Sequence, residues 1–215
     1  MPKRLLVTRP QYGGDGGIYY LFHWSTIYIE FAKAKGTDVL KLDGKRANRK
    51  NLTSIIKKTK PHLICFNGHG SYDSITGQDG ENLVRMNDNE KILKGTIVNI
   101  LACSSGKLLG PSCIKNGTEA VIAYKEEFWL FYDTEGTSRP LDDKIAKLFL
   151  EPANGVINYL LKGHSMEKSY NKSQQLYKEN IQKVLATDSS VGYLAKFLVW
   201  DMVNQVRLGN HNATL

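Results

Sequence analysis

LICFNGHG at residues 63–70 and IVNILACSSG at residues 97–106 are the two stretches that decide the fold of this 215-residue chain. Each begins with a short apolar run and ends in small residues, which is typical of a buried strand in a parallel sheet. Functional side chains of open α/β sheets collect at the carboxyl ends of the strands. We therefore expect His69, which follows the first run, and Cys103, which follows the second, to lie side by side.

Together these two residues would form a nucleophile and its base. The thiolate is the reactive form of cysteine, and a neighbouring imidazole can take the thiol proton and later return it to a leaving group. Gly70 lacks a Cβ, so a substrate can approach its backbone closely, and the N–H groups of Gly70 and Cys103 are the predicted oxyanion hole. We expect residues 104–106 to open a helix whose N-terminus favours the thiolate. The alternative is that both residues are structural, one a core thiol and the other a hydrogen-bonded histidine.

The segments FNGHGS at 66–71 and LACSSG at 101–106 resemble the His-Gly and Ala-Cys signature of the caspase-like (clan CD) cysteine peptidases, which include gingipains, separases, legumains and CHAT domains. The Cys-Ser-Ser-Gly run is similar to separases and CHAT domains. Other features are similar to prokaryotic gingipain-like proteins: Gly110, Gly117, AVIAY at 120–124, PLD at 140–142 and FLEP at 149–152. The resemblance spans about residues 5–209, although LGNH at 208–211 departs from the Gly-Asp-Pro expected there.

The resemblance implies a mostly parallel central sheet flanked by helices, within one caspase-like domain over residues 1–215. Its helical C-terminal part would cover about residues 141–208. The implied activity is that of a cysteine endopeptidase that uses a Cys-His dyad and an acyl-enzyme. Such peptidases need no third acid to orient the histidine. No metal or cofactor is required, and a role for calcium is left open.

The resemblance also points to a P1 pocket bordered by the strand after the nucleophile and by the nearby loops. Its acidic candidates are Asp73, Glu126, Glu127 and Asp133. A carboxylate in the pocket would pair with a basic P1 side chain and reject neutral ones. The gingipain, separase and clostripain branches prefer basic P1, so we predict cleavage after Arg or Lys. An acidic P1 would instead need Arg85 or Arg139 in the pocket.

Composition is that of an ordinary globular domain, with 41% hydrophobic and 23% charged residues. Three cysteines do not indicate a disulfide framework, and no secretory leader or membrane-spanning run is visible. These features predict a cytoplasmic protein. We expect it to bind a peptide or protein substrate and a regulatory or sensor protein. Cleavage within loop 71–96 or 125–140, rearrangement on binding a partner, or dimerisation could each regulate such a peptidase.

The net charge of +8 raises the possibility of nucleic-acid binding through the basic segment at 45–60. A solvated helix face explains that segment better, so nucleic acid is not an expected partner. Two different functions stay open beside the endopeptidase. The chain could be a catalytically silent caspase-like module, or a zymogen, that acts through protein partners. It could also be a flavodoxin-like nucleotide-binding protein that uses Gly13–Gly17, although that run is not a G-x-G-x-x-G motif.

Hydrophobic periodicity and breaker residues predict the remaining elements. Strands are predicted at 3–8, 39–42, 63–66, 97–102 and 118–124, and a short β-ribbon near 83–86. Helices are predicted at 19–35, 48–60, 107–115, 142–151, 154–162, 165–185 and 190–208.

Overall fold

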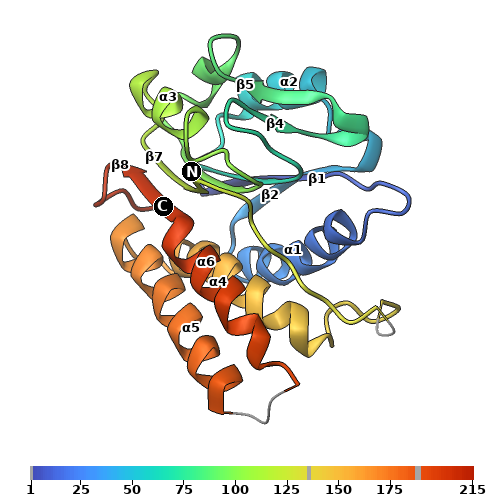
Figure 1. The fold of residues 1–215 in the computed structure, drawn as a ribbon. Helices are drawn as coiled ribbons and strands as arrows, with labels where there is room; N and C mark the ends of the chain where they lie inside the picture. Colours follow the sequence, from blue (N-terminus) through green and yellow to red (C-terminus); the bar gives the residue numbers. More distant parts are fainter. Residues whose placement is uncertain (1, 135–136, 187–189) are drawn as a thin grey trace.

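A computed structural model describes residues 2–134, 137–186 and 190–215. Its centre is a six-stranded sheet with the order β2-β1-β3-β6-β7-β8 (Figure 1). Five strands run parallel: β1 Arg4–Arg9, β2 Asp38–Asp43, β3 Leu63–Asn67, β6 Ile97–Leu101 and β7 Ala120–Tyr124. The sixth, β8 Gln205–Gly209, runs antiparallel to β7. A separate antiparallel ribbon pairs β4 Ser74–Thr76 with β5 Asn82–Arg85.

In the part of the chain that the structure describes, six α-helices and four short 3-10 helices connect these strands. The α-helices are α1 Gly16–Ala34, α2 Arg49–Thr59, α3 Leu109–Lys115, α4 Lys144–Leu161, α5 Met166–Ala186 and α6 Ala195–Asn204. The 3-10 helices are Gly44–Arg46, Gln78–Gly80, Glu90–Leu93 and Gly192–Leu194. The predicted mostly parallel sheet flanked by helices is confirmed.

Both faces of the sheet are covered, which explains why its strands are apolar on both sides. Leu6, Ile64 and Val98 are fully buried on the face under α2 and α3. The residues that precede them, Leu5, Leu63 and Ile97, are buried on the opposite face against α1 and α4. Helices α5 and α6 form a further layer outside α4 (Figure 1).

Helix α4 corrects the prediction of two helices that are separated near Pro152. Proline usually breaks a helix because it lacks the N–H that would bond to the preceding turn. Pro152 is buried inside α4, which continues from Lys144 to Leu161. Leu150 and Ala153 bury the helix against α1, so packing outweighs the lost hydrogen bond.

Strand β8 corrects the predicted helix over 190–208, which ends at Asn204. The chain then pairs with β7, from Gln205 opposite Tyr124 to Gly209 opposite Ala120. The buried Gln205 amide donates to the hydroxyls of Tyr124 and Ser173 at 3.2 and 3.0 Å. These partners are distant in sequence, so local periodicity does not reveal them.

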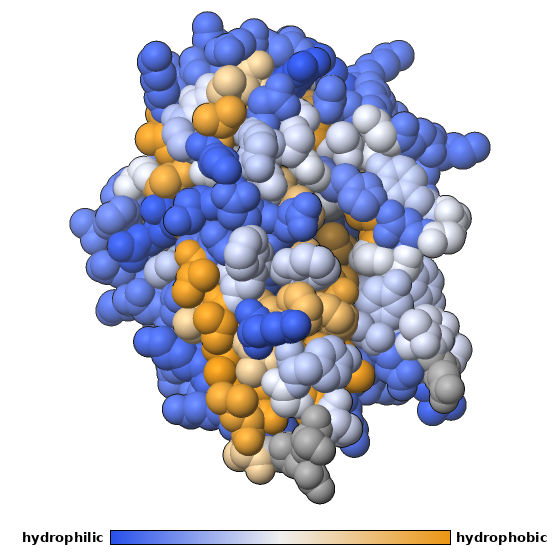
Figure 2. Space-filling model, viewed as in Figure 1, coloured by the Kyte–Doolittle hydropathy of each residue, from blue (hydrophilic) through white to orange (hydrophobic). Residues whose placement is uncertain are grey.

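The surface differs between the two halves of the molecule. Hydrophilic residues cover most of the upper half of the view in Figure 2, and apolar residues gather over the helical lower half. Val199, Trp200 and Val203 of α6 are among the exposed large apolar side chains. No helix within the described residues has the length and apolar character needed to cross a bilayer.

Candidate active site

Strand register places His69 and Cys103 at one edge of the sheet. β3 and β6 are parallel neighbours, and Asn67 pairs with Leu101. His69 and Cys103 each follow that pair by two residues, so the chain carries them off the sheet side by side. Both line one cavity of about 330 Å³. The structure thus brings together the two residues that the strand-end motifs single out.

Gly70 lies directly against the backbone of Cys103. A Cβ built on Gly70 would lie 2.5 Å from the Cys103 carbonyl oxygen and 3.3 Å from the Cys103 nitrogen. Such contacts are too close for a side chain, so glycine is required here. Gly70 forms a narrow antiparallel bridge with Ile75, in which the flanking residues make the hydrogen bonds. The Gly70 N–H therefore has no hydrogen-bond acceptor within the described residues.

The third member of the site is Asp15, which sequence reasoning missed. Its Oδ2 lies 2.7 Å from His69 Nε2, across 54 residues of sequence. Its Oδ1 accepts the Ile18 N–H at 2.9 Å and so caps α1. The Tyr12 ring stacks on the His69 ring with centroids 5.8 Å apart. Asp15 and Tyr12 therefore orient an imidazole whose side chain is 57% exposed.

The signal for Asp15 was its position in the loop after β1, the strand next to β3. The same carboxylate also bears on the nucleotide-binding alternative. A phosphate at the Gly13–Gly17 loop would sit at the N-terminus of α1, where free N–H groups bind anions. Asp15 already places a negative charge there and uses the Ile18 N–H. The loop is therefore poorly suited to a phosphate.

Cys103 lies in a tight turn, which corrects the expectation of a helix opening at residues 104–106. Ser104 has a left-handed backbone with φ of 58°, and α3 begins only at Leu109. The helix N-terminus is therefore too far along the chain to stabilise a thiolate. Burial raises the pKa of the Cys103 thiol, and the carboxylate of Glu127 adds to this effect. The Cys103 side chain is therefore a protonated thiol, and its Sγ lies 4.0 Å from the Phe128 carbonyl oxygen.

The walls of this cavity are mainly apolar. They come from the start of α1, the end of β6 and the segment after β7. The lining residues are Gly17, Ile18, Leu21, Gly68, His69, Leu101, Ala102, Cys103, Phe128, Trp129, Leu130 and Tyr132. The aromatic segment 128–132 thus packs on the core and also lines the cavity.

The four carboxylates predicted for the P1 pocket do not line this cavity. Asp73 accepts a hydrogen bond from Ser71 and pairs with Arg85, and these contacts lower its pKa. Glu126 pairs with Lys107 at 2.8 Å. Asp133 borders a different surface hollow, next to Arg139 and Asp142. Exposed Glu127 is the one of the four whose charge acts on the Cys103 sulfur.

Asp201 on α6 is a second acid that the sequence did not indicate. Its Oδ1 accepts the Trp129 N–H at 2.9 Å, and its Oδ2 is buried without a hydrogen-bond partner. Burial raises the pKa of this carboxyl well above its ordinary value. Asp201 therefore acts as a neutral group that holds the segment 128–132 in place.

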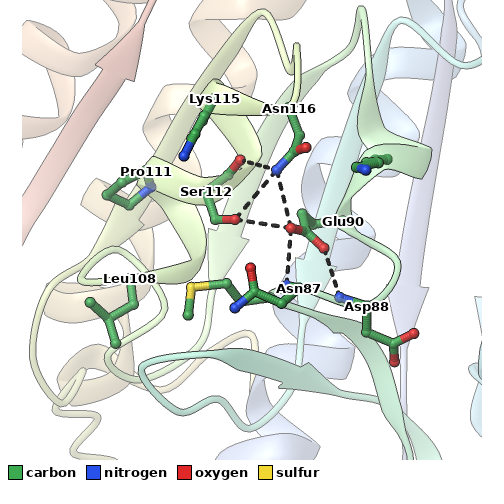
Figure 3. Close-up of a pocket in the computed structure, with 10 residues that line it drawn as sticks. Asn87, Asp88, Glu90, Leu108, Pro111, Ser112, Lys115 and Asn116 are labelled. Atoms are coloured by element: carbon green, nitrogen blue, oxygen red, sulfur yellow. Dashed lines mark hydrogen bonds between the residues drawn. The ribbon is translucent and has the colours of Figure 1, made fainter.

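A larger cavity of about 550 Å³ lies away from Cys103, between α3 and the 3-10 helix at Glu90–Leu93 (Figure 3). Glu90 points into its centre and is nearly fully buried. Its carboxylate accepts hydrogen bonds from the N–H groups of Asn87 and Asp88 and from the side chains of Ser112 and Asn116. Burial alone would raise the pKa of Glu90, but these hydrogen bonds lower it on balance. The cluster ties the β5 side of the molecule to α3.

Comparisons with solved structures identify the architecture. The complex of Porphyromonas gingivalis RgpB pro- and mature domains is 13% identical, with a TM-score of 0.62 over 98% of this chain and 47% of that chain. The Arg-specific cysteine proteinase gingipain R (RgpB) is also 13% identical, with a TM-score of 0.63 over 99% of this chain and 47% of that chain. The fold is caspase-like. The chain spans about half the length of these two proteins.

Sequence comparison adds no assignment. No family model matches the chain, and no curated protein matches it. The caspase-like fold expected from the His-Gly and Ala-Cys motifs is thus supported by structure rather than by sequence similarity.

Proposed function

We propose that this chain is a cysteine endopeptidase in which Cys103 is the nucleophile and His69 the general base and acid. The observation that carries this proposal is the shared cavity of the two side chains, with Asp15 bound to Nε2 of the imidazole. A merely structural histidine would not need a carboxylate on Nε2 and a thiol in the same solvent-accessible cavity. The caspase-like fold of known cysteine proteinases agrees with this proposal.

The first step begins from the protonated thiol. Because Asp15 holds Nε2, Nδ1 of His69 is the nitrogen that takes the proton as Cys103 Sγ attacks the scissile carbonyl carbon. The new S–C bond forms as the carbonyl π electrons move to oxygen. The Gly70 and Cys103 N–H groups then donate to this oxyanion. The Asp15 carboxylate stabilises the imidazolium formed in the same step.

The second half restores the enzyme. The tetrahedral intermediate collapses, the C–N bond breaks and His69 returns its proton to the departing amine. A water molecule next gives a proton to His69 as its oxygen attacks the acyl carbon. The S–C bond breaks, the acid product leaves, and the thiol regains its proton. His69 takes part in every proton transfer in this sequence.

Hydrolysis of a fluorogenic peptide library, varied at P1, tests the proposal. Wild type is compared with Cys103→Ala and His69→Ala under reducing conditions, and Cys113→Ala serves as a matched thiol control because Cys113 is buried under the sheet. We expect activity in wild type and in the control, and a loss of about 1,000-fold or more in both active-site variants. Hydrolysis that survives Cys103→Ala, or no hydrolysis and no labelling of Cys103 by any peptidyl acyloxymethyl ketone, would contradict the proposal. The second result would favour the silent module.

A further inference from the structure

We propose that the cavity beside Cys103 accepts a large apolar P1 side chain, such as Leu, Met or Phe, in place of Arg or Lys. This inference rests on the proposed endopeptidase activity and adds its substrate class. It replaces the basic P1 preference expected from the sequence, because the geometry of the cavity differs from what that preference requires.

The floor of the cavity is built from aliphatic side chains of two elements. Ile18 and Leu21 come from α1, and Leu101 comes from the end of β6. All three are more than nine-tenths buried, so a side chain that enters beside Cys103 meets hydrocarbon at the bottom. Among the described residues, no Asp, Glu, Lys or Arg side chain lines the cavity.

The outer wall is an aromatic segment that is held firmly. Phe128, Leu130 and Tyr132 pack toward the core cluster that contains Ile18 and Leu21. Trp129 and Phe131 instead contact Phe197 of α6, with ring centroids 5.1 and 4.5 Å apart. The segment is thus anchored on both sides, and its apolar side faces the cavity.

The Tyr132 end of the wall has its own support. The Tyr132 ring stacks on Tyr20 with centroids 4.6 Å apart, and its hydroxyl lies against Gly16, where a Cβ would clash with it. The Tyr20 hydroxyl donates to Asp143 at 2.6 Å. The wall cannot easily swing away to admit a distant carboxylate.

The nearby carboxyl groups cannot serve a basic P1 side chain within the cavity. Asp15 is engaged with His69, and the buried Asp201 binds the Trp129 N–H from behind the wall. Glu127 is exposed and is not part of the cavity lining. A guanidinium or ammonium group at the floor would therefore be desolvated without a counter-charge, which is strongly unfavourable.

An apolar side chain would bind favourably here, because its transfer from water to this apolar surface lowers the free energy. The cavity volume of about 330 Å³ is at the small end of the range for ligand sites, which suits one side chain rather than a whole ligand. We expect kcat/KM for Leu or Phe at P1 to exceed that for Arg or Lys by about 100-fold, the discrimination an apolar pocket reaches.

The test measures kcat/KM for matched peptides with Leu, Phe, Arg, Lys or Asp at P1. In parallel, peptidyl acyloxymethyl ketones with the same P1 residues are scored by mass spectrometry for labelling of Cys103. Wild type is compared with Leu21→Asp and Leu130→Glu, each of which places a carboxylate on the cavity wall. Ile27→Asp is the matched control, because Ile27 lies on the same helix as Leu21 and is 41% exposed. Leu130 is only partly buried, so Leu130→Glu provides the answer if Leu21→Asp does not fold.

We expect wild type and Ile27→Asp to prefer Leu and Phe. Each cavity variant should raise the ratio of Arg to Leu by about 10-fold or more. Cleavage after Arg or Lys in wild type that disappears in Cys103→Ala would overturn this inference and leave the endopeptidase proposal standing. If no peptide is cleaved and no ketone labels Cys103, the endopeptidase proposal fails and the inference fails with it.

Discussion

The cavity at Cys103 and the cavity at Glu90 differ in how they treat their polar groups. At Glu90, both carboxylate oxygens are occupied, by two backbone N–H groups and two side chains. At Cys103, the Gly70 N–H has no acceptor within the described residues, and the thiol has one distant partner. The larger, polar cavity is thus internally satisfied, and the smaller, apolar one retains unused hydrogen-bonding capacity.

This difference separates a stabilising site from the proposed reactive one. Buried polar groups are normally hydrogen-bonded, and an unpaired one needs a physical explanation. At Glu90 the hydrogen bonds join two parts of the chain, so the expected role is stability. At Gly70 the unused N–H lies beside the Cys103 backbone, so the expected role is catalysis. Of these two cavities, the smaller is therefore the candidate active site.

The largest expected effect comes from Gly70→Ala. The new Cβ would lie 2.5 Å from the Cys103 carbonyl oxygen and 2.9 Å from the Ala102 Cβ, so the two active-site segments must separate. Loss of an oxyanion-hole donor typically lowers kcat by about 100- to 1,000-fold, and we expect a loss in this range. Gly13→Ala is the control, because a Cβ there has open space and an ordinary φ. Steady-state kinetics with full activity in Gly70→Ala would remove Gly70 from the oxyanion hole.

Asp15→Asn comes next. It removes the carboxylate charge that lies beside Nε2 of His69. Asparagine caps helices as well as aspartate does, so α1 should keep its stability. The imidazolium would lose its stabilising carboxylate, and groups that orient a histidine in this way typically contribute about 10- to 100-fold. We expect kcat to fall by that factor while the melting temperature stays unchanged.

The matched control for this change is Asp142→Asn, which alters an exposed aspartate away from the cavity. Equal kcat values for wild type and Asp15→Asn would show that the Asp15–His69 contact is structural only.

Glu90→Gln tests the other side of the comparison. It should lower the free energy of unfolding at pH 7 by about 1–3 kcal/mol. The NH2 group of the new glutamine cannot accept a hydrogen bond, so the N–H of Asp88 or of Asn87 would lose its acceptor. The kinetic constants should not change. The pKa of Glu90 is lowered in the folded state, so its contribution is present above the unfolded-state pKa of about 4.3 and is lost as the pH falls through the lower folded-state value.

Denaturant unfolding from pH 3 to pH 7 measures this difference, and Glu119→Gln is the control because Glu119 is exposed. We expect the gap between wild type and Glu90→Gln to be widest near pH 7 and to shrink at the acid end. A gap that grows toward low pH would contradict the assignment of Glu90 as an ionised, hydrogen-bonded carboxylate.

Local sequence patterns predicted the parallel strands and most of the helices correctly. Each of these elements is an apolar segment bounded by breaker residues next to it in the sequence. The errors fall where a distant partner decides. Pro152 continues α4 because the helix is buried on several sides, and Gln205–Gly209 becomes a strand because β7 offers an unpaired edge. The start of α3 at Leu109 follows from the turn at Ser104, whose left-handed backbone the sequence does not announce.

The sequence by itself determined that His69 and Cys103 follow neighbouring buried strands, because strand periodicity and breaker residues are local properties of the chain. Only the tertiary structure placed Asp15 on His69, Asp201 behind Trp129 and apolar walls around the cavity. It also showed that Asp73 and Glu126 already have basic partners. These contacts join residues far apart in the chain, and their geometry depends on how whole elements pack.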